Sequence, residues 1–306
     1  MMVAIVRNPV AGGNGQPVRW ARALDAFRQQ FPDLTVHESR SAGDARRLAM
    51  DLAASGVDLV IAAGGDGTIS DVVDGILSSS RPETPLAFLP LGTGSDFVRN
   101  FDLPADPQQL AARIAASAPR QIDAGRITAR DAGGKEFHRH FANIASVGIS
   151  GEIVERVNAP GARRWLSGPV RFFVFSLLTI LRYRPYTFDV LIDGMKVHDG
   201  RLALTAVANG GWFGGGMHVT PEADVADGFF DVAVMREERV SGLIRLLKSL
   251  YKAGHVGHPQ LSFHRGRRVE FRPTDTARFP VEVDGEMPIQ GGFVAEILPG
   301  ALTIRT

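Results

Sequence analysis

Apolar and polar positions follow two patterns along the chain, and the first of them occupies residues 1–120. Short apolar runs with the length of buried strands occur at residues 3–6, 34–38, 57–63 and 85–92. Helical spacing occurs over residues 17–31 and 44–54, and in a third segment that carries Ile69, Val72, Val73, Ile76 and Leu77 on one face. Strands that alternate with helices indicate a parallel sheet, whose ligands bind at the carboxyl ends of the strands. We therefore expect a Rossmann-like α/β domain over residues 1–120.

From about Gln121 the pattern changes to short runs separated by turn residues. These runs lie at residues 187–194, 201–210, 228–235, 261–273, 280–289 and 293–302. Regular short strands with Asp-Gly and Pro/Gly turns are typical of an antiparallel sandwich or barrel. Helical patterns interrupt them at about 163–182 and 240–253. From this pattern we expect a mainly antiparallel sandwich or barrel over residues 121–306.

Composition excludes several classes of function. The chain has 306 residues, of which 44% are hydrophobic and 22% charged, as in a soluble protein of two domains. Its formal net charge of +1 gives no argument for a nucleic-acid partner, and the absence of cysteine excludes disulfides and thiolate catalysis. The apolar segment at 170–181 contains Arg171 and is shorter than the roughly 20 residues that span a bilayer. We expect a cytoplasmic protein.

The stretch "AAGGDGTISDVVDGIL" (62–77) concentrates glycine and aspartate where a strand passes into a helix. Gly64 and Gly65 allow the backbone to approach a ligand closely, and Gly67 and Thr68 open a helix whose free N–H groups attract phosphate. Asp66 would repel phosphate unless a divalent cation lay between them, which suggests magnesium. The alternative is a tight turn with Asp66 as a helix cap. The complete string, placed between a strand and a helix, favours the phosphate site.

Two familiar phosphate-binding motifs are absent from the sequence. There is no G-x-x-x-x-G-K-[ST] and no G-x-G-x-x-G, which argues against a P-loop enzyme and weakens a dinucleotide-dehydrogenase assignment.

Four motifs nevertheless occur in a recognisable order. They are "NPVAGG" (8–13), "GGDGTISDVVDGI" (64–76), "LPLGTGSDFVRNF" (89–101), and "NGGWFGGGMHVTPEADVADGFFDV" (209–232) continuing to "VDGE" (283–286). Together they span nearly the whole chain and resemble the diacylglycerol kinase catalytic-domain superfamily of lipid kinases, which includes sphingosine and ceramide kinase relatives. The second motif also occurs in NAD kinases, whereas its combination with the third is specific for lipid kinases.

The resemblance implies an ATP site in the first domain. The residues it places there are Asn8, Pro9, Gly12, Ser39, Gly64, Gly65, Asp66, Gly67, Thr68, Asp71 and Thr93. Ser39 replaces a threonine of many relatives and Asp71 a glutamate. No lysine follows the first glycine-rich turn, so Arg7 is a candidate substitute, although a strand-end arginine on the surface is the simpler interpretation.

For residues 121–306 the resemblance implies a β-sandwich that serves as the lipid-substrate domain, with the option that the extreme C-terminus packs back on the first domain. In this second domain it implies a structural magnesium held by Asp224, Asp227 and the backbone carbonyl of Phe229. It also makes Glu286 the general base, beside Asp66 as the second catalytic residue. The sequence alone leaves a plainer interpretation open at both places, because Asp227-Gly228 and Asp284-Gly285 are also good hairpin turns.

These expectations describe a lipid kinase of phospholipid metabolism. ATP, with magnesium, would lie in the crevice between the domains and give its γ-phosphate to a lipid hydroxyl such as that of diacylglycerol, at the membrane surface. An NAD kinase-like enzyme and a non-catalytic nucleotide- or lipid-binding regulator are the alternatives. Residues 163–182 and 239–252 have basic and apolar character suited to a membrane surface or to internal helices. The acceptor lipid and the oligomeric state, with a homodimer as one option, stay open.

Overall fold

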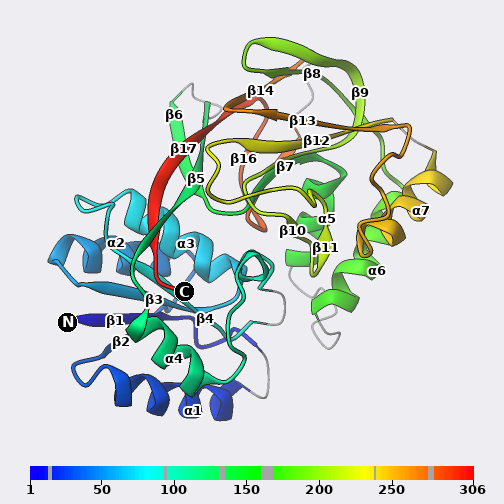
Figure 1. The fold of residues 1–306 in the computed structure, drawn as a ribbon. Coiled ribbons are helices and arrows are strands. Elements are labelled where there is room, and N and C mark those ends of the chain that lie inside the picture. Colours follow the sequence, from blue (N-terminus) through cyan, green and yellow to red (C-terminus); the bar gives the residue numbers. More distant parts are fainter. Residues whose placement is uncertain (13–15, 93–94, 131–134, 160–167, 238, 275–278) are drawn as a thin grey trace. The chain divides into compact units, whose positions relative to one another are not determined.

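The computed structural model describes residues 1–306 apart from 13–15, 93–94, 131–134, 160–167, 238 and 275–278 (Figure 1). The chain divides into two compact units: Met1–Ala124 with Pro299–Thr306, and Gly125–Leu298. The expected boundary at Gln121 falls inside the strand β5 (Arg120–Arg130), whose residues belong to both units. The expected fold class is confirmed: parallel strands form the sheet of the first unit and antiparallel strands that of the second.

The first unit contains a parallel sheet with the strand order β2–β1–β3–β4, which continues to the end of β17. Its strands are β1 (Val3–Arg7), β2 (Thr35–Glu38), β3 (Leu59–Gly64), β4 (Leu86–Pro90) and β17 (Phe293–Ile304). Ile5 pairs with Ile61, Ile61 with Ala87, and Ile304 with Leu86. β1 and β3 are nearly continuous apolar runs because both faces of a parallel sheet are covered by helices.

Helices cover this sheet in two pairs, α1 (Gln16–Gln30) with α4 (Pro107–Ala116) and α2 (Asp44–Ser55) with α3 (Asp66–Leu77) (Figure 1). Phe27 of α1 and Ile114 of α4 belong to one buried cluster with Ile5 and Ile61 of the sheet. The sequence patterns predicted the first three helices but not α4. Asp106 begins α4 by accepting hydrogen bonds from the amides of Gln108 and Gln109.

The second unit is antiparallel, with the strand path β16–β15–β7–β9–β8–β14–β17. Its strands are β5, β6 (Glu136–Phe141), β7 (Ile144–Gly148), β8 (Tyr186–Ile192), β9 (Met195–Ala208), β10 (Trp212–Phe213), β11 (Met217–His218), β12 (Phe230–Arg236), β13 (Leu261–Gly266), β14 (Arg268–Pro273), β15 (Pro280–Val283), β16 (Glu286–Gln290) and β17. The first part of β9 pairs with β8, and its last part lies between β7 and β12.

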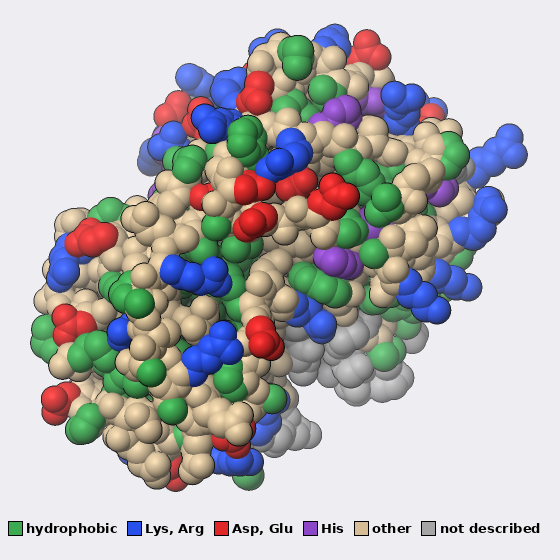
Figure 2. All heavy atoms as spheres, viewed as in Figure 1, with side chains coloured by type: hydrophobic (Ala, Val, Ile, Leu, Met, Phe, Trp, Pro, Cys, Tyr) green, Lys and Arg blue, Asp and Glu red, His purple; other side chains and the backbone are tan. Residues whose placement is uncertain are grey.

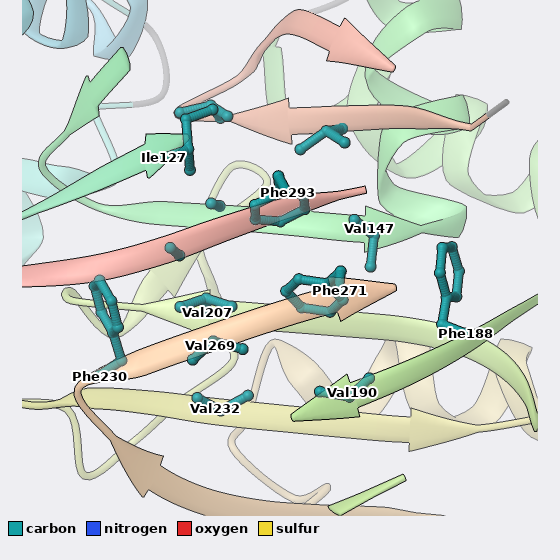
Figure 3. Packing of buried hydrophobic residues seen from close by; sticks show 14 of the residues in the cluster. Ile127, Val147, Phe188, Val190, Val207, Phe230, Val232, Val269, Phe271 and Phe293 are labelled. Carbon is teal, nitrogen blue, oxygen red and sulfur yellow. The ribbon is translucent and has the colours of Figure 1, made fainter. Parts of the chain in front are cut away.

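The strands of this unit enclose a core of aromatic and β-branched side chains. Figure 3 shows part of it, with Phe271 and Phe293 stacked at a centroid distance of 4.6 Å. Phe188 meets Phe279 edge to face at 4.2 Å in the same cluster.

Three helices, α5 (Ile149–Asn158), α6 (Gly168–Ile180) and α7 (Val240–Leu250), contribute to a second core. Ile153, Ile180 and Leu246 pack there with small side chains of β9 and β12 such as Ala206 and Ala233. The helical patterns predicted α6 and α7 but not α5. None of the described helices has both the length and the apolar character needed to cross a membrane.

Candidate active site

The candidate nucleotide residues follow the ends of neighbouring parallel strands. Asn8 comes directly after β1, Ser39 after β2, and Gly64 closes β3. The amide of Asn8 donates to the carbonyl of Ala63 at 3.0 Å, and the amide of Ser39 donates to Arg7 at 2.8 Å. The structure therefore brings the first two motifs and Ser39 to one edge of the sheet, the edge where α/β proteins bind ligands.

The turn after β1 is stabilised by the side chain of Asn8. Its Oδ1 accepts a hydrogen bond from the amide of Val10 at 3.1 Å, and the carbonyl of Asn8 accepts from Ala11 at 3.3 Å. Pro9 lies inside this turn, and Gly12 has a φ of 87°, which favours glycine. The side chain of Asn8 thus shapes the first motif.

The glycines after β3 and β4 allow two backbone segments to touch. The amides of Leu91 and Gly92 donate to the carbonyl of Gly64 at 2.9 and 3.1 Å. A Cβ at Gly92 would lie 2.5 Å from the Cα of Gly65, and a Cβ at Gly64 would overlap Thr68 Oγ1. The second and third motifs therefore form one interlocked structure in which neither Gly64 nor Gly92 has room for a side chain.

Asp66 has a role that sequence analysis did not predict. Its Oδ1 accepts a hydrogen bond at 3.1 Å from the amide of Phe97, the first residue of a 3-10 helix (Phe97–Asn100) in the third motif. Burial raises the pKa of Asp66, although hydrogen bonds from the amides of Asp96 and Phe97 favour the ionised form. Asp66 therefore caps a helix, as in the alternative interpretation. The helix that it caps is the 3-10 helix that begins at Phe97, and not α3, to which Asp66 belongs.

The first turn of α3 lacks a capping side chain at its start because Gly65 occupies the N-cap. Gly67 and Thr68 lie in this turn, and Thr68 is buried. Asp71 is buried in the next turn of the helix, three residues after Thr68. Thr93 lies outside the described residues.

Ser95, which the sequence suggested only as the cap of a short helix and not as a site residue, has an unusual backbone and does not cap the 3-10 helix, whose N-cap is Asp96. The φ of Ser95 is 48°, a region that non-glycine residues seldom occupy, and its side chain is buried. Within the described part of the chain its Oγ has no hydrogen-bond partner. Strained residues with unsatisfied polar atoms often mark functional sites, and these two features can only be seen in a structure.

The side chain of Arg7, the candidate substitute for the missing lysine, contacts two other side chains of the first unit. Its guanidinium lies 4.3 Å from the ring centroid of Trp20 and forms an ion pair with Glu38. Only 12% of its side chain is exposed, so it is neither a surface arginine nor an unengaged cation.

In the second unit, Glu286 begins β16 directly after a tight turn. Asp284 and Gly285 have φ values of 49° and 87°, as expected for the Asp-Gly hairpin turn that the sequence indicated. The side chain of Glu286 is 48% exposed, and its Oε2 lies 3.7 Å from Nη2 of Arg139 on β6. An accessible carboxylate of this kind can accept a proton from an alcohol.

Asp284 does more than form the turn. Its Oδ1 accepts hydrogen bonds from the amides of Asn143 and Ile144 at 3.1 and 3.0 Å, and its Oδ2 accepts from Ala142 at 3.0 Å. The carboxylate thereby fixes the turn before Glu286 to the connection between β6 and β7.

A second carboxyl group beside this turn escaped the sequence analysis. Glu282 is fully buried in β15, where it accepts a hydrogen bond from the amide of Gly285 at 2.6 Å and contacts the hydroxyl of Ser146. Burial raises its pKa to about 8, so it is protonated at neutral pH.

The predicted metal ligands lie in an acidic loop before β12. Figure 2 shows acidic side chains gathered on this unit, and the charges of Asp227 and Asp224 add to burial in raising the pKa of Asp231. Asp227, however, forms an ion pair with Arg265, whose guanidinium lies 5.0 Å from the ring centroid of Phe229. Across the described residues, no three His, Asp or Glu side chains form a group that could hold a metal.

Two family models match the chain. The diacylglycerol kinase catalytic domain matches residues 2–127, and the YegS C-terminal NAD kinase beta sandwich-like domain matches residues 143–306. The diacylglycerol kinase of Mycobacterium tuberculosis (strain H37Rv) is 29% identical over 304 residues, which cover 99% of this chain and 94% of that protein. The diacylglycerol kinase of Bacillus subtilis (strain 168) is 27% identical over 283 residues, which cover 92% and 88%.

Solved structures share the fold. A diacylglycerol kinase from Bacillus anthracis str. Sterne aligns with a TM-score of 0.73 at 21% identity, covering 99% of this chain and 96% of that one. Yeast NADH kinase complexed with NADH aligns with a TM-score of 0.54 at 10% identity, covering 99% and 82%. Because the two family models together account for both units, and one alone matches more than half of the sequence, this chain belongs to the diacylglycerol kinase catalytic-domain superfamily of lipid kinases.

Proposed function

We propose that this protein transfers the γ-phosphate of ATP to the hydroxyl of a lipid, with diacylglycerol as the first acceptor to test. The observation that carries the proposal is the interlocked pair of turns after β3 and β4, where Gly64, Gly65 and Gly92 leave backbone next to an uncapped helix. Amide groups in such a place favour the oxygens of a polyphosphate. Family membership supports a kinase, and ATP as donor follows from it.

In this mechanism the first unit positions the donor. Phosphate oxygens would face the amides of Gly67 and Thr68, while the segments at Asn8, Pro9, Gly12, Ser39, Asp71 and Thr93 would contribute the remaining nucleotide contacts. Phosphoryl transfer has a loose transition state, so positioning and charge neutralisation supply most of the acceleration.

A magnesium ion would supply part of that neutralisation. Asp66 fits such an ion because it is a half-buried residue that places a carboxylate at the phosphate-binding edge, and oxygen is the ligand that magnesium prefers. The set of Asp224, Asp227 and Phe229 does not fit in the arrangement described, because Arg265 occupies the carboxylate of Asp227. Its assignment as a structural metal site stays a prediction, and no step of the mechanism depends on it.

The second unit supplies the base. Glu286 is exposed at the start of its strand, and it would accept the proton of the lipid hydroxyl as the oxygen attacks phosphorus in line. The proton moves from the hydroxyl to Glu286, and ADP leaves.

The lipid would be met at a membrane surface. α7 buries Leu243, Leu246, Leu247 and Leu250 and exposes Arg245 and Lys248. Beside it, a cavity of about 300 Å³ has an apolar wall that includes Ile180 and Leu243. Arg184, Arg201 and Arg239 also line this cavity, together with Glu237, which forms an ion pair with Arg201. An excess of basic over acidic groups beside an apolar wall is suited to the interface of an anionic bilayer.

The test is an assay with radiolabelled ATP across diacylglycerol, a sphingoid base, ceramide and phosphatidylglycerol, with NAD as a further acceptor. We expect label in a lipid. Label in NAD alone would favour the NAD kinase-like alternative. Yeast NADH kinase shares the fold of this chain. Nucleotide binding without transfer to any acceptor would favour a regulator.

A substitution of Glu286 tests the assignment of the base. In Glu286→Gln we expect kcat to fall by about 10²- to 10⁴-fold, because the amide cannot take the proton, while the affinity for ATP stays within about twofold. Glu296→Gln, which changes a surface carboxylate of the same unit, is the matched control. If Glu286→Gln turned over like the unaltered protein, the role of Glu286 would be lost.

A further inference from the structure

Glu282 is a carboxyl group buried where the strand pattern alone places a surface residue. It lies between Val281 and Val283, which join the core of the second unit, and so its side chain projects to the opposite face of β15. That face is covered by α5, which packs against β15. The exposed fraction of Glu282 is 0%.

The carboxyl group is linked to both neighbouring elements. Glu282 pairs with Ser146 across the β15–β7 ladder, and its Oε2 contacts the hydroxyl of Ser146. Ser146 Oγ lies 2.8 Å from Ser150 Oγ at the start of α5. A protonated Glu282 donates a hydrogen bond to Ser146, and Ser146 in turn donates to Ser150. Each hydroxyl hydrogen then serves one hydrogen bond, and both contacts are satisfied.

The other oxygen of Glu282 holds the turn that precedes Glu286. Oε1 accepts the amide of Gly285 at 2.6 Å, and the carbonyl of Gly285 accepts from Nδ2 of Asn158 on α5 at 3.0 Å. The amide of Asp284 donates to Ile144 at 2.9 Å. Glu282 is therefore one of several groups that fix this turn, and its raised pKa brings its own change of protonation close to neutral pH.

We propose that Glu282 is a positioning residue for Glu286, which it holds in place through the Gly285 amide and the Ser146–Ser150 pair. The inference rests on the proposed role of Glu286 as the base. Glu282 touches neither substrate in this proposal and acts only through the turn.

The protonation of Glu282 determines how the effect depends on pH. Burial, followed by the negative charge of Asp284, raises its pKa to about 8, while Ser146 and the Gly285 amide oppose the shift. The other charged groups on the adjoining elements are Glu152, Glu155 and Arg156 on α5 and Glu286 on β16. Ionisation above pH 8 places a second negative charge beside Asp284, which repels it across the turn. It also requires Ser146 to donate to Glu282 instead, so that the hydrogen bond from Ser146 to Ser150 on α5 is lost.

Stability gives a test that does not need an active enzyme. The folded protein keeps a proton that the unfolded chain releases above the ordinary glutamate pKa of 4.5. The contribution of Glu282 to the free energy of unfolding therefore falls between about pH 4.5 and 8. Glu282→Gln cannot ionise, so the difference in urea midpoint between the unaltered protein and this variant should change over this range in favour of the variant as the pH rises. An equal slope in both proteins would overturn the buried, protonated state.

Two substitutions separate positioning from simple burial. Gln at 282 can still accept from Gly285 and donate to Ser146, so Glu282→Gln should retain most of the turnover and lose the decline above pH 8. Glu282→Leu removes the acceptor, so we expect kcat to fall roughly tenfold to hundredfold with KM for ATP within about twofold. Hydrogen exchange at the Gly285 amide should accelerate in Glu282→Leu alone.

The matched control is Glu152→Gln, which alters another carboxyl whose pKa burial raises and which bonds to Tyr186 rather than to the turn. It should leave the pH profile of kcat and the exchange of Gly285 unchanged. If Glu282→Leu kept kcat, the pH profile and the slow exchange, the positioning role would be refuted. If instead the unaltered protein phosphorylated no lipid, the proposed function would fail, while exchange and stability would still decide the structural role of Glu282.

Discussion

Asp74 and Gly75 show how individual residues in one glycine-rich motif carry different tasks. Asp74 is almost fully buried and forms an ion pair with Arg46 of α2. A Cβ at Gly75 would overlap the carbonyl of Arg46, so glycine is required for α2 and α3 to approach this closely. These residues at the end of the motif join two helices, and only its beginning lies at the candidate phosphate site.

Asp74→Ala should therefore destabilise the fold without removing a nucleotide contact. Arg46 would lose its carboxylate partner and keep only the hydrogen bond to Ser78, and because its side chain is about one-third exposed we expect a loss of about 2–3 kcal/mol in the free energy of unfolding. Asp51→Ala is the control, since the pair of Asp51 and Arg47 is exposed on both sides and should be worth less than about 0.5 kcal/mol. Urea denaturation measures both, and equal losses would contradict a buried role for Asp74.

At the scale of elements, the turns after β3 and β4 act as a single element. Asp66 in one turn holds the start of the 3-10 helix that follows the other, and Gly92 packs its backbone against Gly65. Geometry at the candidate site therefore depends on contacts between residues that are 27 positions (Gly65 and Gly92) and 31 positions (Asp66 and Phe97) apart in the sequence.

Alanine at Gly65 and at Gly92 should have different consequences. Gly92→Ala forces the two turns apart and should cost about 1–3 kcal/mol of stability as well as ATP affinity. Gly65 has a φ of −104°, and a Cβ there would meet its nearest atom at 3.5 Å, so Gly65→Ala should fold normally. If phosphate lies against this backbone, Gly65→Ala will still bind ATP more weakly, as calorimetry can measure. Unchanged ATP affinity in Gly65→Ala would place the phosphate elsewhere.

Periodicity predicted the elements in which the spacing of apolar residues matches the positions that are buried in the structure. β1, β3 and α3 have strong apolar patterns because the sheet is covered on both faces. α5 was not predicted, since its ten residues contain Gly151 and several β-branched side chains that weaken helix propensity. Contact with β15 is what holds it, and such support between distant segments leaves no periodic signal.

From the sequence, the candidate site could be predicted only at residues that belong to a recognisable motif. Glu286 and the glycine turns stood out by motif, whereas Glu282 looks like an outward-facing strand residue until α5 is known to cover it. The capping of Phe97 by Asp66 and the strained backbone of Ser95 likewise depend on contacts between segments far apart in sequence.

For the whole molecule, net charge is a poor guide to partners. The formal charge of +1 conceals local groups of one sign, including the basic face of α7 and the acidic loop before β12. An anionic membrane responds to the local charge because salt screens charges beyond roughly 10 Å.

Neutralising Arg245, Lys248 and Lys252 together should weaken binding to phosphatidylglycerol vesicles by about 100-fold, at about 1 kcal/mol for each residue close to the surface. Sedimentation with vesicles of phosphatidylglycerol and of phosphatidylcholine measures the effect. A variant that neutralises Arg19, Arg28 and Arg130 has the same net charge and serves as the control. Equal losses in both variants would show that overall charge, and not this helix, governs binding.

β17 begins in the second unit and ends in the first, where Leu302 and Ile304 are fully buried and Ile304 pairs with β4. On the ribosome, the residues of β1 to β4 emerge long before this strand. The first unit must therefore wait for residues 299–306 before its sheet is complete, and the second unit, which lies between these segments in the sequence, can fold in the meantime. The first unit is thus synthesised first and finished last.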